Sequence, residues 1–112
     1  MTIYALSSGS GVSGVAIIRI SGQETSEVIK ALTSREIPKP RMATLRKINN
    51  INTSELIDEG IIIWFPGPES YTGEDMAEIH IHGGKAVVLA VQKKTIHTFP
   101  SLMLAVYLSE IV

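Results

Sequence analysis

The feature that most constrains the fold is a continuous apolar run, Gly60-Ile61-Ile62-Ile63-Trp64-Phe65, which ends at Pro66-Gly67-Pro68. The run is short for a helix, and its consecutive isoleucines are β-branched, which favours extended backbone. An apolar run without alternation is typical of a strand that is buried on both faces. We therefore predict a buried central strand over residues 60–65, around which the rest of the chain builds a sheet.

Other segments of the sequence have strand character. Each is rich in β-branched or alternating apolar residues and is bounded by Gly, Ser, Pro or Asn. The predicted strands are Thr2–Leu6, Val15–Ile20, Met42–Ile48 and Asp75–His82. A Gly/Ser loop is expected over residues 7–14, and a turn over residues 49–54.

Two segments have helical spacing instead. Val28, Ile29 and Leu32 would share one face of a helix that begins after Ser21, with Ser21 as N-cap and Glu24 completing a capping box. A second helix is predicted from Lys85 onward, with its apolar side formed by Val87, Val88 and Val91. Strands and helices mix without a strict βαβ rhythm. We therefore predict one α+β domain over residues 1–112, a small mixed sheet with two or three helices.

Composition excludes several classes of function. The formal net charge is −1, without the basic excess of a domain that grips nucleic acid alone, so direct nucleic-acid binding is not expected. The chain has no cysteine, which excludes disulfides and thiolate sites. No apolar stretch reaches the roughly 18 residues of a membrane span, and no secretory signal is seen. We expect a cytoplasmic protein that does not enter a membrane.

Two glycine patterns resemble nucleotide-binding loops and fail on their context. Gly9, Gly11 and Gly14 have the spacing of the dinucleotide fingerprint, but a strand pattern follows them where a helix is required. The residues 83–85, Gly-Gly-Lys, lack both the earlier glycine and the following Ser or Thr of a phosphate loop. We predict no dinucleotide or GTP site in this chain.

The stretch from Asp75 to Gly84 is the most informative about a site. Strict alternation places Ala77, Ile79 and Ile81 on one face of a strand. The opposite face then carries three ionisable side chains, which are costly to bury without partners. They are Glu78, His80 and His82. This face is open to three interpretations: a metal site, a solvated surface, or the polar wall of a ligand pocket or subunit interface.

The glycine pair after this strand favours the third interpretation. Gly83 and Gly84 place backbone N–H groups at a helix start, beside the polar face, and such a helix end attracts anions. The loop from Ser70 to Asp75 is either a surface turn or a contact loop in which Tyr71 stacks on a flat heterocycle. Arg19 is the lone charge in its strand. It either points to solvent, or pairs with a ligand carboxylate or with Glu78.

Two blocks of sequence resemble the N-terminal domain of the bacterial tRNA-modification GTPase family MnmE, also called TrmE. The first is TIYALSSGSGVSGVAIIRISG over residues 2–22, with its opening strand, Gly-rich loop and Arg-x-Ser-Gly strand. The second is LIDEGIIIWFPGPESYTGEDMAEIHIHGG over residues 56–84. Lys39-Pro40-Arg41-Met42-Ala43 is similar to a further family stretch between them. The resemblance covers most of residues 2–94.

The resemblance implies a fold and a function. The fold is similar to the folate-binding part of the glycine-cleavage T protein, and the domain forms a homodimer. It implies binding of a tetrahydrofolate derivative, 5-formyl- or methylene-tetrahydrofolate, near the dimer interface. In the intact family protein the one-carbon unit modifies the wobble uridine of certain tRNAs, together with a flavoprotein partner, MnmG (GidA). GTP, magnesium and potassium belong to a GTPase domain whose motifs these residues do not contain.

Position in the family motifs assigns the candidate folate-binding residues. They are Arg19, Tyr71, Thr72, Gly73, Glu74, Glu78, His82, Gly83 and Gly84. The domain is expected to bind and dimerise and not to catalyse by itself. The strand pattern had already pointed to Glu78, His82 and the glycine pair.

The sequence departs from the family over residues 95–112, where the Pro-Gly-Glu-Phe motif of the family does not occur. We expect this tail to derive from an altered reading frame or a truncated gene copy. Two other functions therefore stand beside the folate hypothesis. One is a small metal-dependent enzyme that uses Glu78, His80 and His82, and the other is an idle remnant of a truncated gene.

Overall fold

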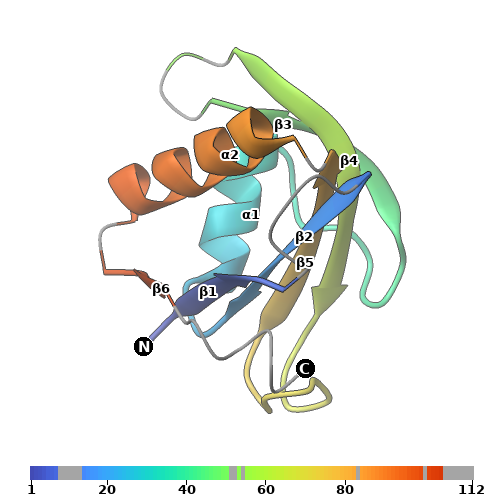
Figure 1. Ribbon diagram of the computed structural model, residues 1–112. Coiled ribbons are helices and arrows are strands. Elements are labelled where there is room, and N and C mark those ends of the chain that lie inside the picture. Colours follow the sequence, from blue (N-terminus) through green and yellow to red (C-terminus); the bar gives the residue numbers. More distant parts are fainter. Residues whose placement is uncertain (8–13, 51–52, 54, 83, 100, 105–112) are drawn as a thin grey trace.

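The computed structural model describes residues 1–7, 14–50, 53, 55–82, 84–99 and 101–104 (Figure 1). Within them, one mixed sheet has the strand order β3-β4-β5-β2-β1-β6. Neighbouring strands are antiparallel except for β1 and β6, which pair in parallel. The sheet and the two helices confirm the predicted α+β class.

The elements lie close to their predicted positions. The strands are β1 (Ile3–Leu6), β2 (Val15–Ser21), β3 (Thr44–Asn49), β4 (Leu56–Phe65), β5 (Met76–His82) and β6 (Met103–Leu104), and the helices are α1 (Thr25–Thr33) and α2 (Lys85–Thr98). The predicted central run is the second half of β4, which lies between β3 and β5 in the sheet. The Gly/Ser loop falls mostly outside the described residues.

Both helices lie on the same side of the sheet (Figure 1). The core lies between the helices and the sheet. It consists of alternate residues of the strands and the inward faces of the helices. The buried core residues are Tyr4, Ala16, Ile18, Ile20, Val28, Ile29, Leu32, Ile48, Ile62, Trp64, Ala77, Ile79, Ile81, Val88, Val91 and Leu102. This arrangement confirms the predicted alternation in β5 and the predicted apolar faces of both helices.

The predicted N-cap of the first helix is wrong. Ser21 is the last residue of β2, and α1 begins at Thr25 with Glu24 as the capping residue. The hydroxyl of Ser21 contacts Thr72 Oγ1 at 2.7 Å, so it is not available to the helix. The capping box fails because the backbone at Ser21 stays extended in register with Met76, and a turn at Gly22 comes before the helix.

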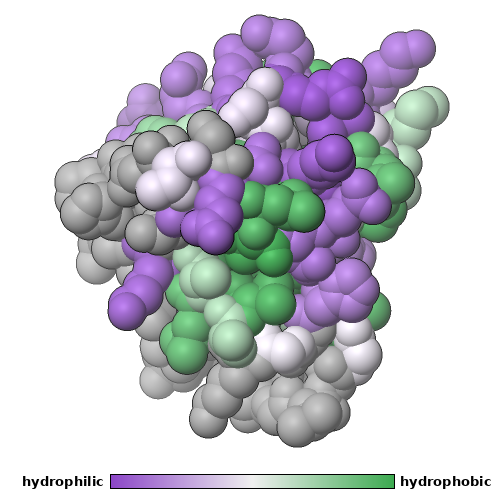
Figure 2. Space-filling view, turned by 90° about the horizontal axis from the view of Figure 1, so that it is seen from above, coloured by the Kyte–Doolittle hydropathy of each residue, from purple (hydrophilic) through white to green (hydrophobic). Residues whose placement is uncertain are grey.

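The surface combines hydrophobic and hydrophilic areas. Seen from above, hydrophobic residues gather near the middle of the view beside hydrophilic ones (Figure 2). Large apolar side chains that are more than half exposed include Val15, Leu45, Leu56 and Leu89. Neither of the described helices is long and apolar enough to cross a membrane.

Candidate functional site

The sheet face opposite the helices carries the candidate site. The side chains of cross-strand partners point to the same side of a sheet, so the register of the strands shows which residues lie on this face. Arg19 pairs with Glu78, Ile17 with His80, and Val15 with His82 between β2 and β5. From β4, Ile63 lies opposite Glu78 and Ile61 opposite His80. We call this surface the open face. It is a short row of polar side chains flanked by apolar ones.

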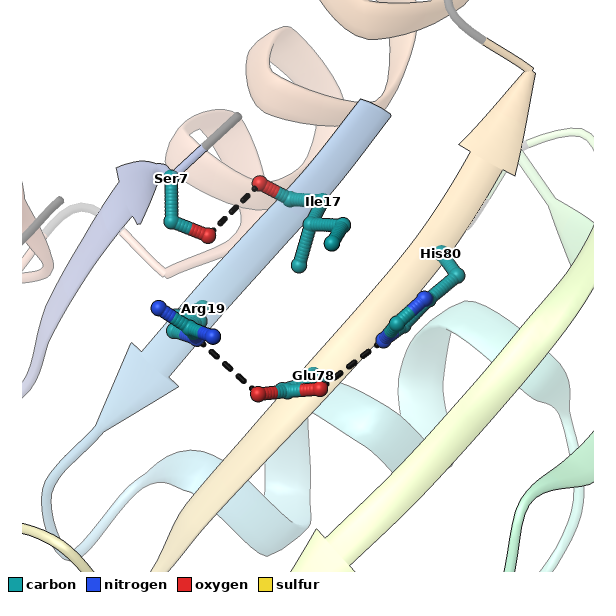
Figure 3. Close-up of polar contacts among 5 residues, drawn as sticks. All are labelled: Ser7, Ile17, Arg19, Glu78 and His80. Atoms are coloured by element: carbon teal, nitrogen blue, oxygen red, sulfur yellow. Dashed lines mark hydrogen bonds and ion pairs between the residues drawn. The ribbon is translucent and has the colours of Figure 1, made fainter. Parts of the chain in front are cut away.

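The centre of the open face is a chain of three polar side chains. The Nε atom of Arg19 donates to Glu78 Oε2 at 2.9 Å, and Glu78 Oε1 lies 2.8 Å from His80 Nε2. Figure 3 shows the Glu78 carboxylate between the guanidinium and the imidazole, with Arg19 on β2 and the other two on β5. The side chains of Arg19 and Glu78 are each 18% exposed. Of the alternatives open for Arg19, the pairing with Glu78 is therefore the one observed.

The contacts of Glu78 hold its carboxyl ionised. Burial alone would raise the pKa of Glu78, but hydrogen bonds from His80 and Arg19, with the positive charge of both partners, outweigh it and lower the pKa. The Arg19–Glu78 ion pair is partly buried, which fixes its geometry, while part of both side chains stays accessible to solvent. Such an arrangement can receive a ligand that supplies N–H donors to Glu78 or a carboxylate to Arg19.

Acid is expected to weaken the fold partly through Glu78. Because the folded-state pKa lies below the unfolded value, Glu78 stabilises the fold above the unfolded pKa, and this contribution is lost as the pH falls through the folded pKa. Between about pH 5 and pH 3 the free energy of unfolding should therefore fall more steeply for the unmodified chain than for a Glu78→Gln variant. Urea unfolding at a series of pH values measures this. Parallel curves for the two proteins would contradict it.

The loop between β4 and β5 closes one end of the open face. Ser21 Oγ and Thr72 Oγ1 are 2.7 Å apart, and Ser21 Oγ also lies 3.4 Å from Glu74 Oε2. Gly73 has a φ of 82°, a left-handed conformation that favours glycine. Tyr71 is 63% exposed. The candidates Thr72 and Glu74 therefore lie at the end of β2 marked by Ser21, two residues along the strand from Arg19.

The opposite end of the open face holds the remaining candidates. Asp58 accepts the backbone N–H of His82 at 2.9 Å, and its other oxygen lies 2.8 Å from His82 Nδ1. Four residues at about 3.3 Å each separate His82 from Glu78, roughly 13 Å. Gly84 caps α2, whose buried residues lie in the core on the other side of the sheet, and Gly83 lies outside the described residues. The structure thus brings together Arg19, Glu78 and, through Ser21, Thr72, but leaves His82 and Gly84 apart from them.

The proposed metal ligands do not converge. His80 contacts Glu78, whereas His82 contacts Asp58 at the end of the strand. Among the described residues no group of three or more His, Asp or Glu side chains is arranged to hold a metal ion. This geometry offers no support for the metal-dependent alternative.

Sequence reasoning missed two residues of the site region. At the end of β5, the Asp58 carboxylate accepts the backbone N–H of His82. Burial would raise the pKa of Asp58, but hydrogen bonds from His82 and Glu59 outweigh this effect and lower the pKa. Ser21 connects the open face to the loop at Thr72. A signal for Asp58 was present, since it lies just before the apolar run that was predicted to be a buried strand, where an acidic side chain needs water or a partner.

The fold and this site together define a small α+β domain with an ion-pair chain on the sheet face opposite the helices. The model of the family described as "GTP-binding protein TrmE N-terminus" matches residues 2–105. The chain belongs to this family.

Individual relatives agree with the family match. The chain is 72% identical over 91 residues, 81% of its own length, to the tRNA modification GTPase MnmE of Pelagibacter ubique (strain HTCC1062), of which it covers 20%. It is 53% identical over 90 residues, 80% of its length, to the mitochondrial 5-taurinomethyluridine-[tRNA] synthase subunit GTPB3 of Danio rerio, of which it covers 18%. The chain therefore spans about a fifth of the length of these relatives.

Proposed function

We propose that this chain is the tetrahydrofolate-binding and homodimerisation domain of a tRNA-modification GTPase that modifies the wobble uridine. The observation that carries the proposal is the half-buried Arg19–Glu78–His80 chain, flanked by Ile17, Ile61 and Ile63, on a sheet face that no helix of the described chain covers. The family relationship supplies the context of tRNA modification.

The chemistry of the open face suits a folate. A pterin ring presents neighbouring N–H donors, which a carboxylate such as that of Glu78 can accept. The glutamate tail of a folate carries carboxylates, which match an arginine. Among the described contacts of Arg19, Nε alone bonds to Glu78, so its terminal nitrogens can serve a ligand. Tyr71, Thr72, Gly73 and Glu74 would form the wall at the Ser21 end.

The apolar part of the open face suits a second copy of the chain. A sheet with helices on one side leaves its other face to be covered, and Val15 and Leu45 on this face are 53% and 58% exposed. Ile17, Ile61 and Ile63 are half-buried on the same face. Packing two such faces together would bury these residues and shield the ion-pair chain from water.

For the whole protein, the family relationship supports a proposal about its partners. We propose a cytoplasmic GTPase whose further domains carry the GTP, magnesium and potassium sites, and which works with tRNA and an MnmG-like flavoprotein. The relatives named as tRNA modification GTPases support this. His82, Gly83 and Gly84 remain candidates for the folate site only if the ligand extends along the whole of β5.

Calorimetric titration of the purified chain with 5-formyltetrahydrofolate, with its mass in solution measured alongside, tests the proposal. We expect saturable binding by a dimer. A folded dimer that binds no folate would remove the folate part of the proposal, and a folded monomer at all concentrations would remove the dimer part.

A charge placed on the open face should separate the dimer. Val15→Glu is expected to weaken self-association at least tenfold, because dimerisation would remove the added carboxylate from water. The control is Leu89→Glu on α2, since Leu89 has the same exposure, 53%, but lies on the other side of the molecule's sheet. Sedimentation equilibrium measures both. Equal effects of the two variants, or no effect of Val15→Glu, would place the dimer contact elsewhere.

A further inference from the structure

Positive charge is concentrated in one segment of the chain. Six of the ten Lys and Arg residues lie between residues 30 and 47, together with one of the eleven acidic residues, Glu36. This segment carries a net charge of +5, whereas the whole chain carries −1. The total charge is therefore small only because a strongly basic segment and an acidic remainder cancel each other. We call the six side chains the basic edge: Lys30, Arg35, Lys39, Arg41, Arg46 and Lys47.

Of these residues, Arg41, Arg46 and Lys47 lie along one border of the sheet, with Arg46 and Lys47 on opposite faces of β3, whereas Lys30 lies on α1. β3 is the outermost strand next to β4. Arg46 lies opposite Gly60, and Lys47 opposite Glu59, in this ladder. Further along the same border, the backbone N–H of Arg41 donates to the carbonyl of Trp64 at 2.7 Å. From Trp64 to Glu59 the border of β4 is about 17 Å long at 3.3 Å per residue, which is long enough to meet several phosphates of one strand.

Few of the positive charges of the basic edge have an ion-pair partner among the described residues, although Glu59 lies opposite Lys47 in the ladder. The ion pair described there joins Lys30 to Glu36 at 3.8 Å, and the Glu36 side chain is 88% exposed. Arg35, Lys39, Arg41 and Lys47 are exposed and have no ion pair within the described part of the chain. A charged border can also serve to prevent edge-to-edge aggregation, but Lys30 and Arg35 lie outside the edge strand β3 and are not needed for that.

A hollow lies within the basic edge, between the end of α1 and β3. It has a volume of about 310 Å³ and is lined by Thr33, Arg35, Leu45, Arg46, Lys47, Asn49 and Glu59. The Nε of Arg46 is buried there without a hydrogen-bond partner among the described residues. A buried donor without a partner is costly, and a turn of the Arg46 side chain toward a bound anion would satisfy it.

We propose that the basic edge binds the sugar–phosphate backbone of RNA, and that it is the surface by which this domain contacts the tRNA. The identity of the RNA rests on the proposed function, whereas the binding of a polyanion rests on the charges alone. The segment from 30 to 47 contains no aromatic residue, so we expect backbone contacts without base stacking or sequence preference. Attraction that acts within about 8 Å depends on local charge, so a net charge of −1 for the chain does not oppose it.

The test compares two variants with the same change in charge. In the first, Arg35, Arg41 and Lys47, all exposed, are each replaced by Glu. In the control, the lysines of α2 at 85, 93 and 94 are each replaced by Glu. Binding of a fluorescent tRNA transcript is followed by anisotropy at several salt concentrations. Titration with 5-formyltetrahydrofolate and thermal unfolding are measured on the same samples.

The basic-edge variant is expected to bind tRNA at least tenfold more weakly, with a salt dependence that is lower by about two to three ions, while the α2 variant stays near the unmodified chain. No tRNA binding by the unmodified chain at low salt, or equal losses in both variants, would overturn the proposal. If the charge reversals unfold the chain, the corresponding Gln variants replace them. Loss of folate binding in every protein, with the tRNA difference intact, would count against the proposed function and not against the basic edge.

Discussion

A Gly60→Ala variant is expected to lose about 3 kcal/mol or more of its free energy of unfolding, which is a large part of the stability of a domain of this size. A Cβ atom at position 60 would lie 2.2 Å from the carbonyl oxygen of His80 on the neighbouring strand. That oxygen belongs to the backbone, so the clash can be relieved only by moving β4 away from β5. Both are inner strands of the sheet, and β5 carries Glu78 and His80.

The matched control is Gly14→Ala, because a Cβ atom there meets nothing within 4 Å. It should leave the midpoint of urea unfolding nearly unchanged. Both variants are measured by urea unfolding followed by circular dichroism. If Gly60→Ala unfolds at the same urea concentration as Gly14→Ala, the close approach of β4 and β5 at this position is wrong.

The second large effect is expected at Arg19. Arg19→Ala should weaken the binding of 5-formyltetrahydrofolate by about tenfold to a hundredfold, because a charge-assisted hydrogen bond contributes on the order of 1.5–3 kcal/mol. The substitution also leaves Glu78 without its partner at 2.9 Å. Arg19→Lys keeps the charge but loses the planar pair of donors, so it should recover only part of the affinity.

The control for Arg19→Ala is Lys93→Ala, which removes a positive charge from the exposed surface of α2. Calorimetry gives the dissociation constants, and thermal unfolding shows whether each variant is folded. Unchanged affinity in a folded Arg19→Ala variant would exclude Arg19 from the folate site. Equal losses in both variants would mean that overall charge, and not the open face, governs binding.

Much of the fold was predictable because the spacing of apolar residues along the sequence indicates which face of a strand or helix is buried. The alternation in β5 and the helical spacing of Val28, Ile29 and Leu32 gave the correct buried faces. The apolar run before Pro66 gave an inner strand. The pairing of Arg19 with Glu78 was one of the open alternatives, since a charge within a strand needs either water or a partner.

The remaining features depend on which strands become neighbours, which local pattern does not determine. Ser21 has the sequence context of an N-cap, but its place beside Met76 in the ladder keeps it extended. Asp58 reaches His82 only because β4 lies next to β5. The candidates in the Ser70–Asp75 loop and those at the end of β5 are close in sequence but lie at opposite ends of one strand. The expectation of no direct nucleic-acid binding used the total charge of −1, and it stays a prediction until the tRNA titration is made.

An NMR titration of the isotopically labelled chain with 5-formyltetrahydrofolate tests most directly whether the open face is the folate site. We expect saturable shift changes in β2 and β5 around Arg19, Glu78 and His80 and in the loop around Thr72, with little change in α1. Saturable changes confined to other surfaces, or none in a folded dimer, would contradict the assignment of the open face as the folate site.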